Sequence, residues 1–193
     1  MKKYFLISIL IFSAISFTGC GTKNIAYDKY NIERNLNSNI SRIDNKSIKI
    51  VDLSQQKIVR KLGNKSYSFV TYELEASKMN TEISKEFFKQ YFNLVESGEE
   101  LFTVESKITD YSITGGTGNP NNLNVDLTLD IKVIKNGKTI LNKTYSKRAS
   151  GVTVWEWRLT LDETTFRKLQ KGVLSIYENE FKADLLKALK ENK

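Results

Sequence analysis

The sequence predicts an α+β domain in which an antiparallel sheet of four to six strands carries two helices packed on one face. The first observation is residues 123–134, where apolar and polar side chains alternate throughout, as in a strand with one buried face. The second is a pair of stretches, 80–97 and 160–189, whose apolar residues recur at helical spacing. Because sheet and helix each need a partner for their apolar face, we expect the helices to cover the sheet on one side only.

Strand patterns recur along most of the chain. We expect strands at 47–53, 57–61, 67–73, 101–113, 123–134, 138–146 and 152–159. In the first of them, Ile48, Ile50 and Asp52 share one face. The stretch 70–79 could equally begin the helix that follows it.

Two turns connect the central strands. Asn136-Gly137 is the strongest short hairpin signal, so 138–146 should return beside 123–134. Residues 114–122 contain the run Gly115-Gly116-Thr117-Gly118 but lack the Lys-Ser/Thr of a phosphate-binding loop, and no helix follows them. We therefore expect a hairpin loop at 114–122.

The helix expected over 80–97 has Asn80 or Thr81 as its cap and Gly98 just past its end. Its apolar stripe consists of Ile83, Phe87, Tyr91, Leu94 and Val95. We expect this stripe to be core that packs against the sheet.

The last helix follows a capping box at 160–163 and is interrupted only by Gly172. Its apolar stripe consists of Phe166, Leu169, Val173, Ile176, Tyr177, Phe181, Leu185 and Leu189. Its outer face carries Lys168, Lys171, Glu178, Lys182 and Lys187. We expect this helix to close the core by packing on the sheet, and docking in a partner is the alternative.

Residues 1–19 have the pattern of a secretory signal, in which a positive start precedes an apolar run over 4–17 that is too short to cross a bilayer. The run ends in Phe17-Thr18-Gly19-Cys20, which resembles the bacterial lipobox, where a signal peptidase cuts before the Cys. The resemblance implies a diacylglyceryl group on the Cys20 thiol and an acyl group on the new amine. The alternative is an ordinary signal peptide with a chance Cys.

We expect three parts in the chain: the signal over 1–19, the lipidated Cys20 with a tether over 20–46, and a single periplasmic domain over 47–193. The tether is rich in Asn and Ser, and as a flexible coil it would reach roughly 25–30 Å, with some of it against the domain. Gly21, where the enteric sorting rule needs Asp for inner-membrane retention, favours the outer membrane. The periplasmic side is favoured over the cell surface.

Composition excludes several kinds of site. The chain has no His and one Cys, so a Ser-His-Asp centre, an intrachain disulfide and a Cys-based zinc cluster are impossible. We expect no enzyme activity, no metal and no cofactor. Four strand carboxylates could do acid–base work if one were buried, although solvated strand residues are the favoured interpretation. They are Asp52, Asp110, Asp126 and Asp130.

The formal net charge is +8, and its excess of Lys (24 Lys, 6 Arg) is typical of a solvated surface. Lys57, Arg60 and Lys61, followed by Lys65, form a basic segment that an anionic membrane surface or lipopolysaccharide could attract. A solvated hairpin is the favoured alternative. Nucleic acid is not expected as the partner of an exported chain without a stacking motif.

Trp155 and Trp157 lie on one face of the strand expected at 152–159. They are either a platform for a sugar or a partner protein, or part of the core beneath the last helix. Glu156 and Arg158 on the opposite face favour the core for at least one of them.

The order of elements resembles the small outer-membrane lipoproteins of the YajG-like type, which are related in layout to ABC-transport auxiliary lipoproteins. In that pattern a first strand ending in Asp (Asp52) precedes a Gly-containing loop (Gly63) and a helix (83–95). A strand–turn–strand with Val133, Asn136-Gly137-Lys138 and Tyr145 then precedes the final helix. The resemblance covers 47–190.

This resemblance implies no catalytic residues. It implies a non-enzymatic protein anchored in the membrane by its N-terminal lipid, which acts as an accessory of envelope transport or assembly through an envelope protein partner. The alternative is a surface-exposed adhesin or ligand-binding lipoprotein. The oligomeric state stays open.

Overall fold

The computed structural model describes residues 22–25, 42–44, 46–61, 71–96, 100–115, 123–150 and 161–192. In chain order its elements are β1 (Thr22–Ile25), β2 (Ser47–Asp52), β3 (Ile58–Lys61), β4 (Thr71–Leu74), α2 (Ala76–Lys89), β5 (Asn93–Leu94), β6 (Phe102–Thr114), β7 (Asn124–Lys135), β8 (Lys138–Ala149), α3 (Leu161–Ser175), the π-helical segment η5 (Ile176–Phe181) and α4 (Lys182–Glu191). The strand expected at 152–159 and the capping residue Thr160 lie outside the described residues.

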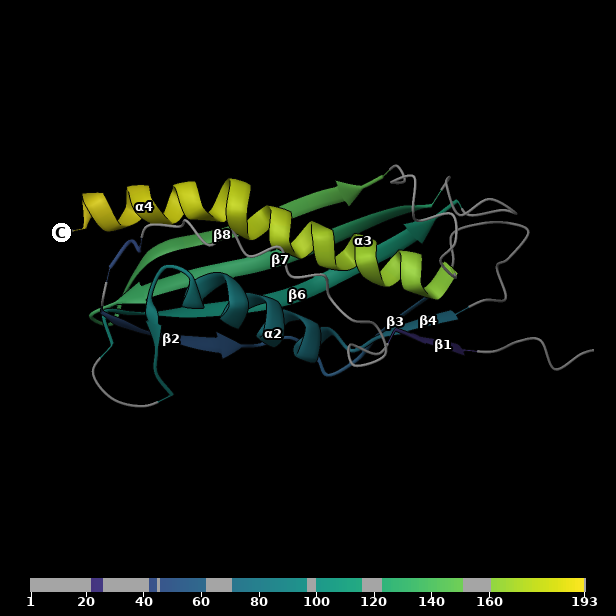
Figure 1. Cartoon of the computed structure of the whole chain (residues 1–193), viewed down its shortest axis with the longest axis horizontal. Helices are drawn as coiled ribbons and strands as arrows, with labels where there is room; N and C mark the ends of the chain where they lie inside the picture. The colour runs from purple at the N-terminus through teal and green to yellow at the C-terminus, as the bar shows by residue number, and fades with distance from the viewer. Residues whose placement is uncertain are drawn as a thin grey trace, which may run out of the picture.

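The strands form a five-stranded sheet in the order β5-β2-β6-β7-β8 and a three-stranded sheet in the order β1-β4-β3. The predicted α+β class is confirmed, with α2 and the C-terminal helix on the same face of the larger sheet (Figure 1). The sheet is mixed rather than purely antiparallel, because β2 runs parallel to both β5 and β6. This follows from the chain path: β3, β4 and α2 intervene before the chain returns beside β2, so no hairpin joins these strands.

The meander β6-β7-β8 confirms the predicted alternation. All six inward-facing residues of the predicted strand are buried: Leu123, Val125, Leu127, Leu129, Ile131 and Val133. A two-residue turn joins β7 to β8, with Asn136 at φ 51° and Gly137 at φ 74°. Positive φ at both positions is the type I′ geometry that Asn-Gly favours, because its twist matches that of the strands.

The first helix differs from its prediction at both ends. It begins at Ala76, so Asn80 is not a cap but a fully buried residue in the body of α2. It ends at Lys89, and Leu94 lies instead in the short strand β5, opposite Ile48 of β2. Leu94 still contributes to the apolar interior, because in β5 it is partly buried and packs against the core.

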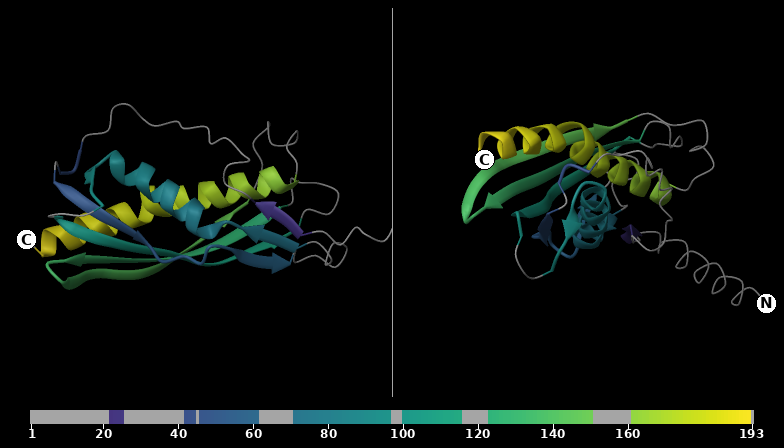
Figure 2. Two further views of the ribbon diagram at one scale, coloured as in Figure 1. Left: turned by 90° about the horizontal axis from the view of Figure 1, so that it is seen from below. Right: turned by 60° about the vertical axis from the view of Figure 1, so that its left-hand side comes forward.

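The C-terminal helix runs without a break from α3 through η5 to α4 and crosses the sheet along its length (Figure 2). Its predicted stripe is buried from Phe166 to Leu185, so it closes the core as expected. Lys168 was predicted on the outer face, but it is only 2% exposed. The reason is that α3 contacts β1 and α2 as well as β7 and β8, so its first half is enclosed on several sides.

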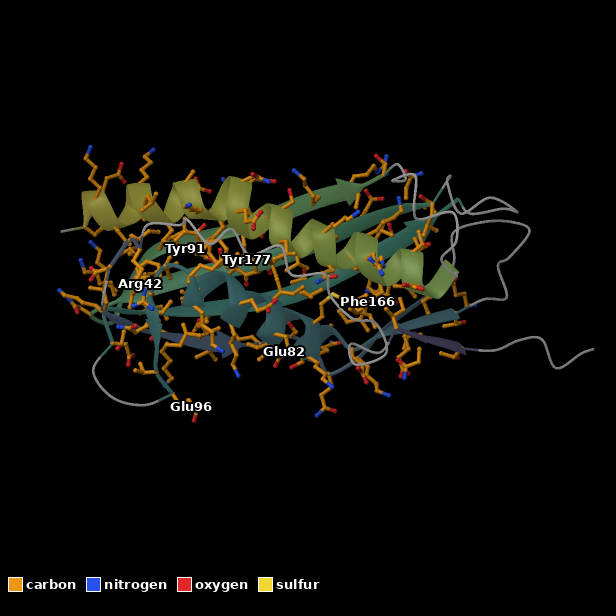
Figure 3. All side chains as sticks on the ribbon, viewed as in Figure 1. Arg42, Glu82, Tyr91, Glu96, Phe166 and Tyr177 are labelled. Carbon is orange, nitrogen blue, oxygen red and sulfur yellow. The ribbon has the colours of Figure 1, made fainter. Side chains whose placement is uncertain are left out.

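Aromatic rings join the two helices. Phe87 of α2 stacks on Tyr177 of η5 at a centroid distance of 5.2 Å, and Phe88 meets Phe181 edge-on at 5.8 Å. Figure 3 shows Tyr91 and Tyr177 between the helices, whereas Glu82 and Glu96 point away. Such pairs contribute about 0.5–1.5 kcal/mol each beyond their buried area, so they hold α2 against η5.

Candidate functional site

The basic segment predicted from the sequence lies on β3 and the residues just before it. Lys57 forms an ion pair with Glu73 (Nζ–Oε1, 2.6 Å), and this hydrogen bond raises the pKa of Lys57. Arg60 forms an ion pair with Asp110 (Nη2–Oδ1, 2.6 Å). Lys61 is exposed and makes no ion pair with any residue that the structure describes. Two of these three charges are therefore shared with acidic neighbours.

The other predicted contact residues lie outside the described part of the chain. They are Cys20, Lys65, Trp155 and Trp157, together with most of the loop expected at 114–122. Their roles stay predictions.

The pairing of β3 with its neighbours shows at which end of the three-stranded sheet the basic segment lies. β3 pairs antiparallel with β4, which sets Lys61 opposite Thr71. β1 pairs parallel with β4 on its other side, which sets Thr22 opposite the same Thr71. Lys61 therefore lies at the end of the three-stranded sheet where the chain enters from residue 20.

The face of the large sheet opposite the helices is polar in the part that the structure describes, as predicted for Asp126 and Asp130. Asp126 receives two hydrogen bonds from Arg148 (2.7 and 3.0 Å), and these lower the pKa of Asp126. Asp130 accepts a hydrogen bond from Thr144 Oγ1 (2.6 Å). A general acid needs a raised pKa, so Asp126 is shifted in the opposite direction.

Asp52 differs from its prediction as a solvated strand residue. It is half-buried and accepts hydrogen bonds from the Ser54 amide (3.1 Å), Ser54 Oγ (2.6 Å), Ser77 Oγ (2.5 Å) and Asn80 Nδ2 (2.6 Å). The reason is that α2 begins directly over the end of β2, so the face that buries Ile48 also covers this carboxylate.

The network around Asp52 continues into the core. Asn80 Nδ2 also donates to Ser106 Oγ of β6 (2.9 Å), and Tyr177 OH donates to Asn80 Oδ1 (3.4 Å). Burial raises the pKa of Tyr177, so this phenol stays a neutral donor. The four hydrogen bonds that Asp52 accepts from described residues, together with those of Asn80, join β2, α2, β6 and η5.

Sequence reasoning missed this network because its members are far apart in the chain. One local signal was available: Asp52 shares a strand face with Ile48 and Ile50, so a carboxylate there had to be solvated or hydrogen-bonded.

A half-open groove of about 430 Å³ lies between α2 and β5. Its lining residues are Ile50, Thr81, Lys85, Lys89, Leu94, Val95 and Glu96. Its two lysines exceed its single carboxylate, Glu96, by one charge, so together with the apolar side chains they suit a ligand with an apolar part and an acidic group.

Within the described ranges, no group of three or more His, Cys, Asp or Glu side chains is arranged to hold a metal ion. None of the helices in those ranges combines the length and the apolar character that crossing a bilayer requires.

No protein-family model matches the chain, and no curated protein sequence does so either. Among solved structures the fold is similar to XCC0632 from Xanthomonas campestris, whose family model is DUF330. The TM-score is 0.52 at 6% identity, over 78% of this chain and 90% of that chain. At this identity the similarity establishes a shared fold and nothing more.

Two further structures are less similar. A minor lipoprotein from Acinetobacter baumannii has a TM-score of 0.38 at 8% identity, covering 77% of this chain and 95% of that chain. A neuraminyllactose-binding hemagglutinin homolog from Helicobacter pylori has a TM-score of 0.40 at 10% identity, covering 84% and 95%.

Proposed function

We propose that this chain is an exported bacterial lipoprotein that is cut before Cys20 and held in the membrane by acyl chains on that residue. The observation that carries the proposal is the sequence Phe17-Thr18-Gly19-Cys20 at the end of the apolar run, where the chain's single Cys falls at the lipidation position. Several acyl chains on one residue anchor a protein firmly, whereas one chain alone is marginal.

The domain acts by binding rather than by catalysis, as an accessory of envelope transport or assembly. The polar face of the large sheet and the groove with two lysines support a binding role. The YajG-like layout and Gly21 favour the periplasmic side of the outer membrane, with an envelope protein as partner. The alternative is a surface adhesin or ligand-binding lipoprotein.

The anchor is tested by Cys20→Ala in a bacterial host that processes lipoproteins. Because the thiol is the acyl acceptor, the variant should stay as unprocessed precursor and incorporate no labelled fatty acid. Thr18→Ala is the matched control, since it keeps a small residue two positions before an intact Cys20 and should be processed normally. A Cys20→Ala chain that is membrane-bound at the normal mature mass would overturn the proposal.

Protease treatment of whole cells separates the two sides of the membrane. Protection of the wild-type chain until the outer membrane is permeabilised supports the periplasmic accessory. Cleavage in intact cells supports the surface-exposed alternative.

A further inference from the structure

The first described strand begins almost at the proposed anchor. Thr22 opens β1, and only Gly21 separates it from Cys20. Two peptide units span at most about 7.6 Å between the Cα atoms of residues 20 and 22. The lipid attachment point is therefore within about one side-chain length of the folded domain, far closer than a flexible tether over 21–46 would place it.

β1 is an integral part of the domain. It pairs in parallel with β4 along all four of its residues, and α3 packs against it. Ile25, at the inner end of β1, is fully buried in the core. Releasing the domain from the anchor would therefore require pulling a paired strand and a core side chain out of the fold.

We propose that the domain rests on the bilayer with the end at which β1 begins, and that Lys61 at the end of β3 faces anionic lipid headgroups there. The proposal rests on the lipid anchor at Cys20 given above and adds the surface that meets the membrane. The register fixes the geometry, because Lys61, Thr71 and Thr22 lie side by side across β3, β4 and β1.

The rest of the topology defines the two ends of the molecule. β6 and β8 finish, and α3 begins, at the end of the molecule where β1 begins, while the C-terminus lies at the opposite end (Figures 1 and 2). β6 has 13 residues, which at about 3.3 Å each gives a length of about 43 Å. In this orientation the β7–β8 turn, and Lys138 at the start of β8 beside it, stand away from the membrane.

Charge favours the same orientation. Lys61 is exposed and has no acidic partner among the described residues, while the Arg60–Asp110 pair is solvated, with 41% and 57% of the two side chains exposed. Basic residues near a membrane surface are attracted to anionic lipids, and the attraction falls off within a Debye length. Two strand spacings, about 10 Å, separate Lys61 from Thr22, so with this end of the domain on the bilayer the Lys61 side chain reaches the headgroups.

The single Cys allows a direct test. The processed form, residues 20–193, is coupled through the Cys20 thiol to maleimide lipid in vesicles of phosphatidylcholine, with or without phosphatidylglycerol. Lysine acylation is then read by mass spectrometry at Lys61 and, as the matched exposed site at the other end, at Lys138. We expect coupling to slow acylation of Lys61 severalfold and leave Lys138 unchanged, with stronger protection when phosphatidylglycerol is present.

The control is a Cys20→Ala chain with a cysteine added after Lys193, which couples through the opposite end and should leave Lys61 reactive. Equal acylation of Lys61 and Lys138 in the Cys20-coupled form would overturn the orientation. Protection of Lys61 without any dependence on phosphatidylglycerol would overturn the headgroup contact. Maleimide supplies the anchor chemically, so these results are independent of whether cells lipidate Cys20.

Discussion

Gly172→Ala should stabilise the protein, and Gly137→Ala should destabilise it, although the space around the two glycines suggests the reverse. Gly172 is buried in α3 over β7, and a Cβ built there lies 3.5 Å from Leu127 Cδ2 and 3.9 Å from Leu127 Cβ. Gly137 lies in the β7–β8 turn, and a Cβ built there meets no atom within 4 Å.

Backbone conformation decides the sign of each effect. At Gly172 the backbone is helical, and both distances to Leu127 are ordinary van der Waals contacts, so a methyl group fits. Alanine in a helix interior is favoured over glycine by about 1 kcal/mol, which sets the expected gain in the free energy of unfolding. At Gly137 the φ of 74° is left-handed, where a Cβ costs about 1–2 kcal/mol.

Urea unfolding of residues 20–193, followed by circular dichroism, measures both changes. We expect the midpoint to rise for Gly172→Ala and fall for Gly137→Ala at unchanged slope. Loss of stability in Gly172→Ala would mean that α3 lies closer to β7 than these distances allow. Gly172→Leu should be strongly destabilising, because a side chain that large must displace Leu127.

Two further predictions concern strand β7 and the ion pair between β8 and α4. Leu127→Ala should lower the free energy of unfolding by about 2–5 kcal/mol, because Leu127 is 2% exposed. Thr128→Ala, on the opposite face of β7, should change it by less than about 0.5 kcal/mol. Similar losses for the two variants in urea unfolding would contradict the register. The second concerns Asp184, whose pKa is held below its ordinary value of 3.8 by the hydrogen bond from Lys143 (2.7 Å). A carboxylate with a lowered folded pKa stabilises the fold above its unfolded pKa and loses that contribution as pH falls through the folded one, so Asp184→Asn should lose less stability than wild type below about pH 4. Parallel pH curves for the two chains would contradict this assignment.

The sequence predicts best what neighbouring residues decide among themselves. The alternation around Leu127 and Thr128, the turn at Asn136-Gly137 and the stripe of the last helix all depend on local spacing, and the structure confirms them. The end of α2 depends on a distant contact instead. Leu94 keeps the helical spacing, yet it pairs with Ile48 of β2.

The candidate site was harder to predict for the same reason. Glu73 and Asp110, which neutralise Lys57 and Arg60, come from β4 and β6. No local pattern in the basic segment reveals that two of its charges are paired. Likewise, the network of Asp52 draws on α2, β6 and η5, so its composition becomes visible only once the chain is folded.

β1 links the proposed membrane attachment to the stability of the core. A segment expected to act mainly as a tether contributes a buried Ile25 and one wall of the enclosure around the first half of α3, where Lys168 is buried. A tether that only connected the domain to its anchor could be lengthened or replaced without changing the stability of the fold. Here the residues nearest the proposed lipid are also core residues, so the domain cannot move far from the membrane and keep all of its core contacts. With Cys20 as the proposed anchor, the same strand would set both how close the domain lies to the bilayer and which end faces it.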